Sequence, residues 1–366
     1  MGFGSGAGHP RGDRLQSLRR LPRTLPKLGL VLLWGSALVL AGCNGTDAPP
    51  PDATLSPDPA ALVSTPLPNP GPLQLQVIRG TEAEGNLVAS TLILGATEAI
   101  LVDAQAKPSQ AQGVIQALQA SGKTLKAIWI THGHADHYFG LTAIVAAFPD
   151  VPIYTTPAIA AEIQTRTPAF LQVFQQNFPE EQVTAPPLPM AYSDPTLTID
   201  GETVEIIPLT QGDTPHQAPL HIPSLSTVIA GDVVYGDVHL YLREALNPEG
   251  RQAWLASLDE LAALNPQQII PGHASPTYQA PGLEPLEQTR QYLLEFDRAV
   301  AESATLEEAR SALMTRYPNY RYPFLLDSAL KTLYPEDAAP DPSQDFPESA
   351  PEDSPEDSPE DLAPDL

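Results

Sequence analysis

Cysteine is nearly absent from this sequence: its 366 residues contain a single one, Cys43, close to the N-terminus. One cysteine cannot form a disulfide within the chain, so disulfides are excluded as a source of stability. No thiol follows residue 43, which also excludes a cysteine nucleophile and cysteine metal ligands from the rest of the chain. Any metal site there has to use His, Asp and Glu side chains.

Basic residues are scarce as well: 19 Lys and Arg stand against 44 Asp and Glu, a formal charge of −25. Six of the basic residues and one acidic residue precede Cys43, so cleavage at Cys43 would leave 13 basic against 43 acidic residues, a formal charge of −30. A chain this acidic repels phosphate backbones. We therefore expect no nucleic-acid partner, which argues against a nuclease.

A long apolar run is missing too. The apolar stretch 28–40 is shorter than the roughly 20 residues of a membrane-spanning helix. It follows a basic segment and ends in Leu40-Ala-Gly-Cys43, which resembles the lipobox of bacterial lipoproteins. We predict that residues 1–43 are a lipoprotein signal peptide and that Cys43 carries the lipid, palmitate included; the alternative is an ordinary signal peptide with an incidental cysteine. The protein would then be a membrane-anchored, extracytoplasmic lipoprotein of the bacterial cell envelope.

Composition divides the chain after Cys43 into four parts. Residues 44–71 are rich in Pro and Asp and indicate an extended tether. Residues 72–280 hold most of the regular apolar patterns and form the predicted main domain, and 281–334 read as a C-terminal helical extension. Residues 335–366 are acidic, with a repeated Pro-Glu-Asp motif, and are predicted to be a disordered tail.

Apolar periodicity in the main domain alternates between strands and helices. Short strand pairs with interspersed helices predict an α/β fold in which two sheets are sandwiched between helices. The segment 167–192, rich in Phe, Gln and Pro, is interpreted as a lid or insertion after a helix that ends near residue 165. The predicted strands cover 73–78, 86–94, 99–103, 125–130, 151–154, 197–201, 204–209, 220–223, 227–230 and 268–271, and the helices 109–120, 139–148, 157–165 and 251–264.

Four ligand-type side chains crowd the loop between the predicted strand 125–130 and the helix 139–148. They are His132, His134, Asp136 and His137. Imidazole and carboxylate groups bind divalent zinc, and also iron or manganese. An isolated loop histidine is usually a surface residue, but four such residues within six positions predict a metal centre.

Further candidate ligands follow three later strands. Gln211-Gly-Asp-Thr-Pro-His216 follows the strand 204–209, Asp232 follows the strand 227–230, and His273 follows the strand 268–271. A glycine precedes the candidate in each segment and allows a sharp turn into a site. One Asp between two ions, with histidines around it, would hold a water and make hydroxide available near neutral pH.

With these motifs, residues 73–275 resemble the metallo-β-lactamase fold superfamily. His132-x-His134-x-Asp136-His137 matches its signature, Asp232 its bridging aspartate, His273 its last histidine, and Asp103 the aspartate that ends an early strand. The resemblance implies an αββα sandwich that binds two zinc ions, with iron or manganese as alternatives. It also implies that Asp136 binds the second ion, orients the water and protonates the leaving group.

One segment departs from the family pattern. The family has Gly-His-Thr where this sequence has Gly212-Asp213-Thr214. We favour His216 as the replacement ligand, with Asp213 or Gln211 as alternatives, and this ligand decides whether one or two ions bind. His239 is a candidate for contact with substrate or with a ligand, and packing explains it equally well.

The expected activity is metal-dependent hydrolysis, in which metal-bound hydroxide attacks a small ester, lactone, lactam or thioester. One alternative is an iron-dependent oxidoreductase of the same fold, although related flavin-linked di-iron enzymes usually have Glu where His134 stands. Another is a non-catalytic, metal-binding envelope lipoprotein, which the altered segment at Asp213 permits.

Overall fold

The computed structural model of the protein describes residues 63–66, 71–80, 87–280 and 282–335. The predicted signal peptide with Cys43, nearly all of the acidic tail and most of the tether lie outside these residues. Among the described residues, no helix combines the length and the apolar character needed to cross a membrane.

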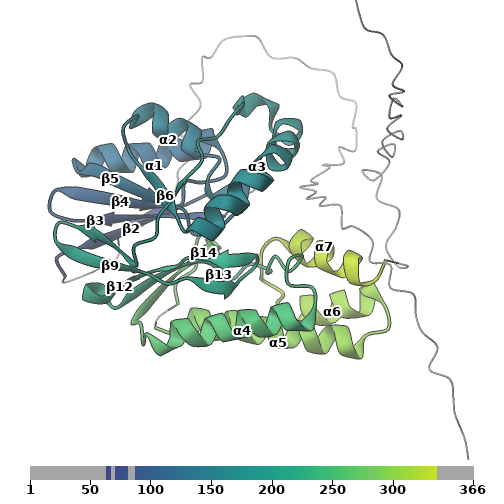
Figure 1. The fold of residues 1–366 in the computed structure, drawn as a ribbon. Coiled ribbons are helices and arrows are strands. Elements are labelled where there is room, and N and C mark those ends of the chain that lie inside the picture. The colour runs from purple at the N-terminus through teal and green to yellow at the C-terminus, as the bar shows by residue number, and fades with distance from the viewer. Residues whose placement is uncertain (1–62, 67–70, 81–86, 281, 336–366) are drawn as a thin grey trace, which may run out of the picture. The chain divides into compact units, whose positions relative to one another are not determined.

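The first sheet has seven strands in the order of the sequence. Its first four are antiparallel neighbours, and the last three continue the sheet in parallel. Two helices cover its outer face, and a third lies at the edge beside its last strands (Figure 1). The strands are β1 (Val63–Pro66), β2 (Gln74–Arg79), β3 (Ala89–Leu94), β4 (Glu98–Val102), β5 (Thr124–Trp129), β6 (Ile153–Thr155) and β7 (Met190–Ala191), and the helices α1 (Pro108–Ser121), α2 (Leu141–Ala147) and α3 (Pro157–Asn177).

The second sheet has five strands in the order β14-β13-β12-β9-β8. Only β13 and β14 pair in parallel, as expected for strands that a helix connects. The helices α4 and α5 lie along its outer face (Figure 1). The elements are β8 (Thr196–Ile199), β9 (Glu202–Ile206), β12 (Leu220–Ile222), β13 (Thr227–Gly236), β14 (Gln268–Ala274), α4 (Pro248–Ala263) and α5 (Glu284–Glu302), with a separate hairpin of β10 (Leu209–Gln211) and β11 (Pro215–Gln217).

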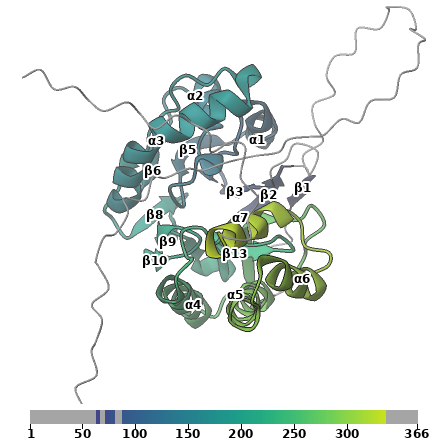
Figure 2. The ribbon, with the colours of Figure 1, turned by 90° about the vertical axis from the view of Figure 1, so that its right-hand side faces the viewer.

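Helices, two sheets and helices therefore follow one another as layers, which confirms the predicted αββα fold class. The extra C-terminal helices are also present: α6 (Leu306–Arg316) and α7 (Pro323–Leu333) follow α5 (Figure 2). An apolar core joins them to the second sheet through the fully buried side chains of Trp254, Tyr292 and Phe296. Burial of such large aromatic side chains stabilises the extension, since each removes 150–250 Å² from water.

The interpretation of residues 167–192 as a lid is wrong for its first part. Helix α3 does not end near residue 165 but continues through Pro168 to Asn177. Proline inside a helix removes one hydrogen bond and strains the preceding turn. The buried face formed by Thr167, Phe170 and Phe174 outweighs that cost.

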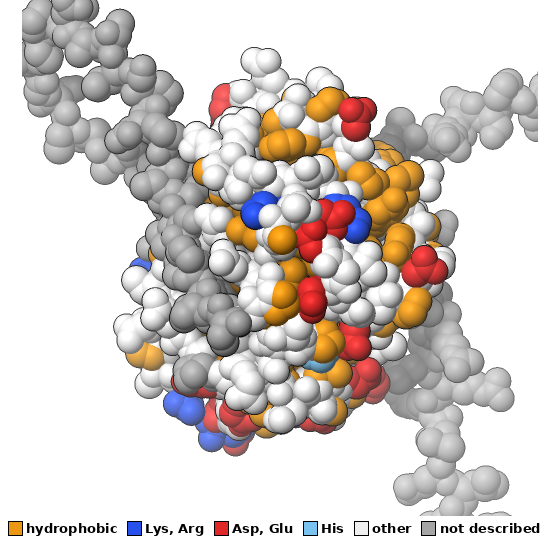
Figure 3. Space-filling view, turned by 90° about the vertical axis from the view of Figure 1, so that its left-hand side faces the viewer, with side chains coloured by type: hydrophobic (Ala, Val, Ile, Leu, Met, Phe, Trp, Pro, Cys, Tyr) orange, Lys and Arg blue, Asp and Glu red, His pale blue; other side chains and the backbone are white. Residues whose placement is uncertain are grey.

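Charged side chains on the edge opposite α7 are of mixed sign. In Figure 3, Lys and Arg side chains lie in small groups, close to Asp and Glu, among apolar and uncharged ones. This face offers no broad basic surface of the kind that binds phosphate backbones.

Candidate metal centre

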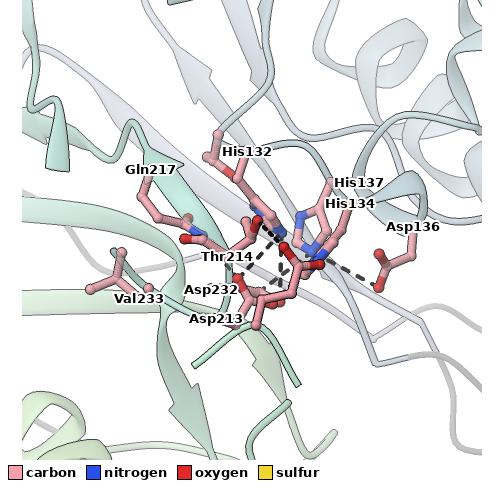
Figure 4. Close-up of polar contacts among 12 residues, drawn as sticks. His132, His134, Asp136, His137, Asp213, Thr214, Gln217, Asp232 and Val233 are labelled. Atoms are coloured by element: carbon pink, nitrogen blue, oxygen red, sulfur yellow. Dashed lines mark hydrogen bonds and ion pairs between the residues drawn. The ribbon is translucent and has the colours of Figure 1, made fainter. Parts of the chain in front are cut away.

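The candidate ligands converge from four segments, two of which follow strands and two of which lie within strands. The loop after β5 carries three histidines and Asp136, and a 3-10 turn, η2 (Ala135–His137), presents the last of them. Asp232 lies within β13 and His273 within β14. Asp213 comes from the turn of the β10–β11 hairpin. Figure 4 shows the side chains of the loop pointing toward Asp213 and Asp232.

Two groups of ligand atoms form, and all of their side chains are buried. The first group is His132, His134, Asp213 and Asp232; the second group is Asp136, His137 and His273. Within each group, the candidate atoms all lie within 4.8 Å of one another.

In the first group, two imidazole nitrogens face two carboxylates. His134 Nδ1 lies 2.9 Å from Asp213 Oδ2. His132 Nε2 lies 3.9 Å from Asp213 Oδ1 and 3.8 Å from Asp232 Oδ2. This is a two-nitrogen, two-oxygen set with two carboxylates, which suits zinc and also the harder ions iron and manganese.

In the second group, Asp136 lies between two imidazoles. His273 Nε2 is 3.1 Å from Asp136 Oδ2, and His137 Nε2 is 4.0 Å from the same oxygen. His137 Nε2 also lies 3.4 Å from Asp232 Oδ1. Asp232 therefore contacts both groups and is placed to bridge two ions.

One observation in particular indicates that these side chains fit divalent cations. The Nε2 atoms of His132 and His137 are buried and have no hydrogen-bond partner among the described residues. Their other ring nitrogens are held: His132 Nδ1 lies 3.0 Å from Thr131 Oγ1, and His137 Nδ1 lies 2.8 Å from Asp103 Oδ2. Each ring thus directs a free nitrogen at a buried cluster of carboxylates, as metal-ligating histidines do.

Asp103 and Tyr235 form hydrogen bonds that position the candidate ligands. Asp103, at a positive φ of 58°, accepts hydrogen bonds from the backbone N–H and the hydroxyl of Thr131, at 2.9 and 2.8 Å. The Tyr235 hydroxyl lies 3.0 Å from Asp213 Oδ2 and 2.9 Å from Asp232 Oδ2, so these two carboxylates share its single proton. Gln217 Nε2 donates to the other oxygen of Asp213 at 2.9 Å.

The charges of the centre shift the pKa values of its side chains in opposite directions. Burial lowers the pKa of His132, and neighbouring His137 lowers it further. Burial also opposes the charged form of His273, but Asp232 and Asp136 outweigh it and raise its pKa to about 9. Burial raises the pKa of Asp213 to about 7.

Metal affinity is therefore expected to rise with pH. Below about pH 9 His273 holds a proton that an ion must displace, and below about pH 7 Asp213 holds another. For each proton displaced, affinity should fall about tenfold per pH unit as the pH decreases. Competition with a chromophoric chelator at pH 6, 7.5 and 9 measures this dependence. Equal affinity at all three values would contradict it.

Two glycines allow close packing around the ligands: Gly231 of β13 packs against Thr131, and Gly272 of β14 packs against Asp232. Gly231, at a φ of +54°, precedes Asp232, and a Cβ there would lie 2.7 Å from Thr131 Oγ1. A Cβ on Gly272 would lie 2.1 Å from Asp232 Oδ1. Neither position accepts a side chain unless a candidate ligand or its support moves.

Gly272→Ala is expected to displace the Asp232 carboxylate and weaken metal binding by at least about tenfold, with about 1–3 kcal/mol of overpacking added. Metal content and thermal unfolding of the variant measure both effects. Gly122→Ala is the matched control, because a Cβ there meets nothing within 4 Å, although its φ of +65° adds local strain. Wild-type metal content in Gly272→Ala would contradict the placement of Asp232.

The preference for His216 as the replacement ligand is not supported. His216 is exposed and lies outside both groups, while Asp213, which was the alternative, is fully buried in the first. Gln211 is buried, but its side-chain amide donates to backbone oxygens, at 3.1 Å to Gly212. All the other predicted ligands lie in one of the two groups. Metal binding by them remains a prediction.

Two further histidines lie outside both groups. His239 is buried, its Nδ1 is 2.7 Å from the Tyr292 hydroxyl, and burial lowers its pKa to about 4. It packs among aromatic side chains of the C-terminal extension, so the packing interpretation is the better one. His221 pairs with Glu205 at 2.8 Å on the second sheet, in agreement with a structural role.

Sequence reasoning missed several residues around the centre: Glu162, Arg166, Thr214, Gln217, Tyr235 and Glu244. Glu162 and Arg166 lie one helical turn apart, but only a longer α3 would have revealed them as a pair. No local pattern marks Glu244, which lies in the segment between β13 and α4.

Comparisons with known proteins agree with this architecture. The sequence model of the metallo-beta-lactamase superfamily matches residues 83–273, more than half of the chain. A hydroxyacylglutathione hydrolase of Synechococcus sp. (strain WH7803) is 30% identical over 201 residues, which cover 48% of this chain and 75% of that protein. The uncharacterized protein YobT of Bacillus subtilis (strain 168) is 28% identical over 177 residues, which cover 47% of this chain and 70% of YobT.

Among solved structures, a metallo-beta-lactamase from Pontibacter korlensis is similar at 17% identity and a TM-score of 0.45, over 63% of this chain and 99% of that one. The match of the superfamily's sequence model and the Synechococcus relative decide the classification. The chain belongs to the metallo-beta-lactamase superfamily.

Proposed function

We propose that this protein is a hydrolase that depends on two divalent ions, zinc in the first place, and that cleaves a small ester, thioester, lactone or lactam. The observation that carries the proposal is the pair of ligand groups, which Asp232 connects through His137 and His273, with the Nε2 atoms of His132 and His137 directed at buried carboxylates. The Synechococcus relative, named a hydroxyacylglutathione hydrolase, supports a hydrolytic reaction on a small acyl compound.

Bound ions would lower the pKa of a water molecule and would polarise the carbonyl oxygen of the substrate. The side chains of the protein have separate tasks. With ions bound, His132, His134 and His137 would present neutral nitrogens as ligands, and Asp232 contacts both groups. Among the described residues, Asp136 has only the imidazoles of His137 and His273 as polar partners. It is therefore placed to orient the water and to pass its proton to the leaving group.

The charge of the surroundings restricts the substrate. Asp103, Asp136, Asp213, Asp232 and Glu244 surround the centre, and two divalent ions would only roughly balance them. Polyanionic substrates are disfavoured for this reason, and neutral or singly charged acyl compounds are the proposed class.

Hydrolysis of a substrate panel tests the proposal. Purified protein is assayed on thioesters, lactones, esters and β-lactams, before and after chelation, and again after zinc, manganese or iron is restored. We expect turnover of at least one class that disappears on chelation and returns with metal. Full metal occupancy without turnover of any class would overturn the proposal of a hydrolase.

We also propose that Cys43 anchors the protein to the bacterial cell envelope on the extracytoplasmic side. The support is the sequence alone, in which the apolar stretch 28–40 leads into Leu40-Ala-Gly-Cys43. Labelled palmitate should be incorporated into the wild type and not into Cys43→Ser. Equal labelling of both proteins, or none in the wild type, would contradict the anchor.

A further inference from the structure

A carboxylate holds the outer nitrogen of His134. His134 Nε2 lies 3.1 Å from Glu244 Oε1, while its Nδ1 faces Asp213 at 2.9 Å. An ionised carboxylate can only accept a hydrogen bond, so Nε2 carries the proton. When an ion displaces the proton that lies between Nδ1 and Asp213, the lone pair of Nδ1 would be directed into the first group.

Glu244 is itself fixed by donors on both of its oxygens. Arg166 Nη2 donates to Oε1, and Arg166 Nη1 donates to Oε2 at 3.1 Å. The Thr214 hydroxyl donates to Oε2 at 2.8 Å. With these bonds the carboxylate has four donors, and its side chain is only 17% exposed. Because donors occupy both oxygens, the Glu244 carboxylate is held in one position relative to His134.

Helix α3 provides the far end of this network. Arg166 Nη1 also pairs with Glu162, one turn earlier on the helix, and the Arg166 side chain is 10% exposed. A buried guanidinium between two carboxylates is a stable unit only when all three are present, because removing one leaves an uncompensated buried charge. The network therefore links α3, which packs on the first sheet, to a candidate ligand.

Arg166 is poorly placed for another role, that of binding an anionic group of the substrate. Its two terminal nitrogens are taken by Glu162, Glu244 and Thr214, the last at 3.3 Å. Its Nε is buried and has no hydrogen-bond partner in the part of the chain that the structure describes. A substrate anion would have to displace a carboxylate to reach it.

We propose that Glu244 is a positioning residue for the metal ligand His134, and that the Arg166–Glu162 pair of α3 holds Glu244 in place. The inference rests on the metal binding of the proposed function. It assigns a task to three residues that no part of the signature motif contains. It also gives each of the three histidines of the loop an outer partner: Thr131 for His132, Glu244 for His134 and Asp103 for His137.

Metal affinity and the absorption spectrum of the cobalt-loaded protein test this inference independently of activity. Outer partners of ligating histidines typically change metal affinity 10–100-fold. We expect that loss for one of the two ions in Glu244→Ala, together with an altered cobalt spectrum. Glu244→Gln should lose less, since its amide oxygen can still accept from His134. Arg166→Met should change metal affinity in the same direction as Glu244→Ala.

Glu205→Gln is the matched control. Glu205 also accepts a hydrogen bond from a histidine, His221, at 2.8 Å, but neither residue belongs to the two ligand groups. It should leave affinity and spectrum unchanged. Unfolding of the metal-free variants is measured alongside, and if Glu244→Ala does not fold, Glu244→Gln and Arg166→Met decide. Wild-type affinity and spectrum in these variants would overturn the inference, and so would a raised KM in Arg166→Met with unchanged metal binding. A wild type that binds no ion would overturn the proposed function as well.

Discussion

Asp232→Asn is expected to lower kcat/KM for any substrate of the enzyme about 10³-fold and to leave less than two ions per chain. Asp232 is fully buried and contacts both ligand groups. Asparagine has the same shape but no charge, so the ions would lose a shared anionic ligand. An ion supplies several kcal/mol of transition-state stabilisation, and about 1.4 kcal/mol corresponds to a factor of ten.

Hydrogen bonding makes the change more severe. The Tyr235 hydroxyl donates to Asp232 Oδ2, and His273 Nδ1 lies 2.9 Å from its other oxygen. Both oxygens face donors, so the amide nitrogen of an asparagine would meet one of them in either orientation. A buried donor left without an acceptor costs about 1–3 kcal/mol.

Steady-state kinetics and metal analysis of the same preparations measure the effect. Asp259→Asn is the control, since Asp259 is an exposed carboxylate that accepts from Arg290 on the helical side of the second sheet. It should retain both ions and wild-type kinetics. Two ions per chain in Asp232→Asn would show that this residue does not bridge them.

The part of the centre that is local in sequence could be predicted from sequence alone. His132, His134, Asp136 and His137 lie on one short loop, so a strand followed by a helix is enough to bring them together. Asp232 and His273 each follow an apolar strand, and parallel pairing of β13 with β14 places them side by side. These residues were all predicted, because strand order and local chain direction determine where they lie.

The choice between Asp213 and His216 depended on the register of a hairpin, which composition does not reveal. Leu209 pairs with Gln217 and Gln211 with Pro215, so residues 212–214 form the turn and Asp213 reaches the centre from it. Along β11 successive side chains alternate between faces. Gln217 is buried against Asp213, and His216 consequently faces solvent.

The network around Glu244 could not be predicted for a different reason. Its members come from α3, from the hairpin turn and from the segment before α4, and only tertiary packing brings them together. Arg166 even lay beyond the predicted end of its helix, because residues 167–192 were interpreted as a lid or insertion, whereas α3 continues to Asn177. Residues that support ligands from distant segments carry no local pattern of their own.

Asp103→Asn is expected to weaken metal binding in both groups through a change of histidine tautomers. Asp103 Oδ2 accepts from His137 Nδ1 and from the Thr131 hydroxyl. Since that hydroxyl has a single proton and donates it to Asp103, it accepts from His132 Nδ1. Both imidazoles are thereby protonated on the outer nitrogen and present a free Nε2 to the centre.

An amide nitrogen in the place of Asp103 Oδ2 reverses this chain of donors. It would donate to His137 Nδ1 and to Thr131 Oγ1, and the Thr131 hydroxyl would then donate to His132 Nδ1. Each ring would carry its proton on Nε2, which cannot ligate an ion in that form. Backbone strain does not explain the effect, because asparagine tolerates the left-handed conformation of Asp103.

The expected result is a 10–100-fold loss of affinity for each ion, with kcat/KM reduced at least as much. Asp200→Asn is the matched control. Asp200 also has a positive φ, of 48°, and accepts hydrogen bonds from the backbone N–H and the hydroxyl of Thr97. It is exposed, however, and belongs to neither ligand group. Chelator competition on both variants, with nitrogen-15 spectra of the histidine rings, separates a tautomer change from general damage. If Asp103→Asn bound both ions as the wild type does, Asp103 would not set the tautomers of His132 and His137, and the free Nε2 atoms would need another cause.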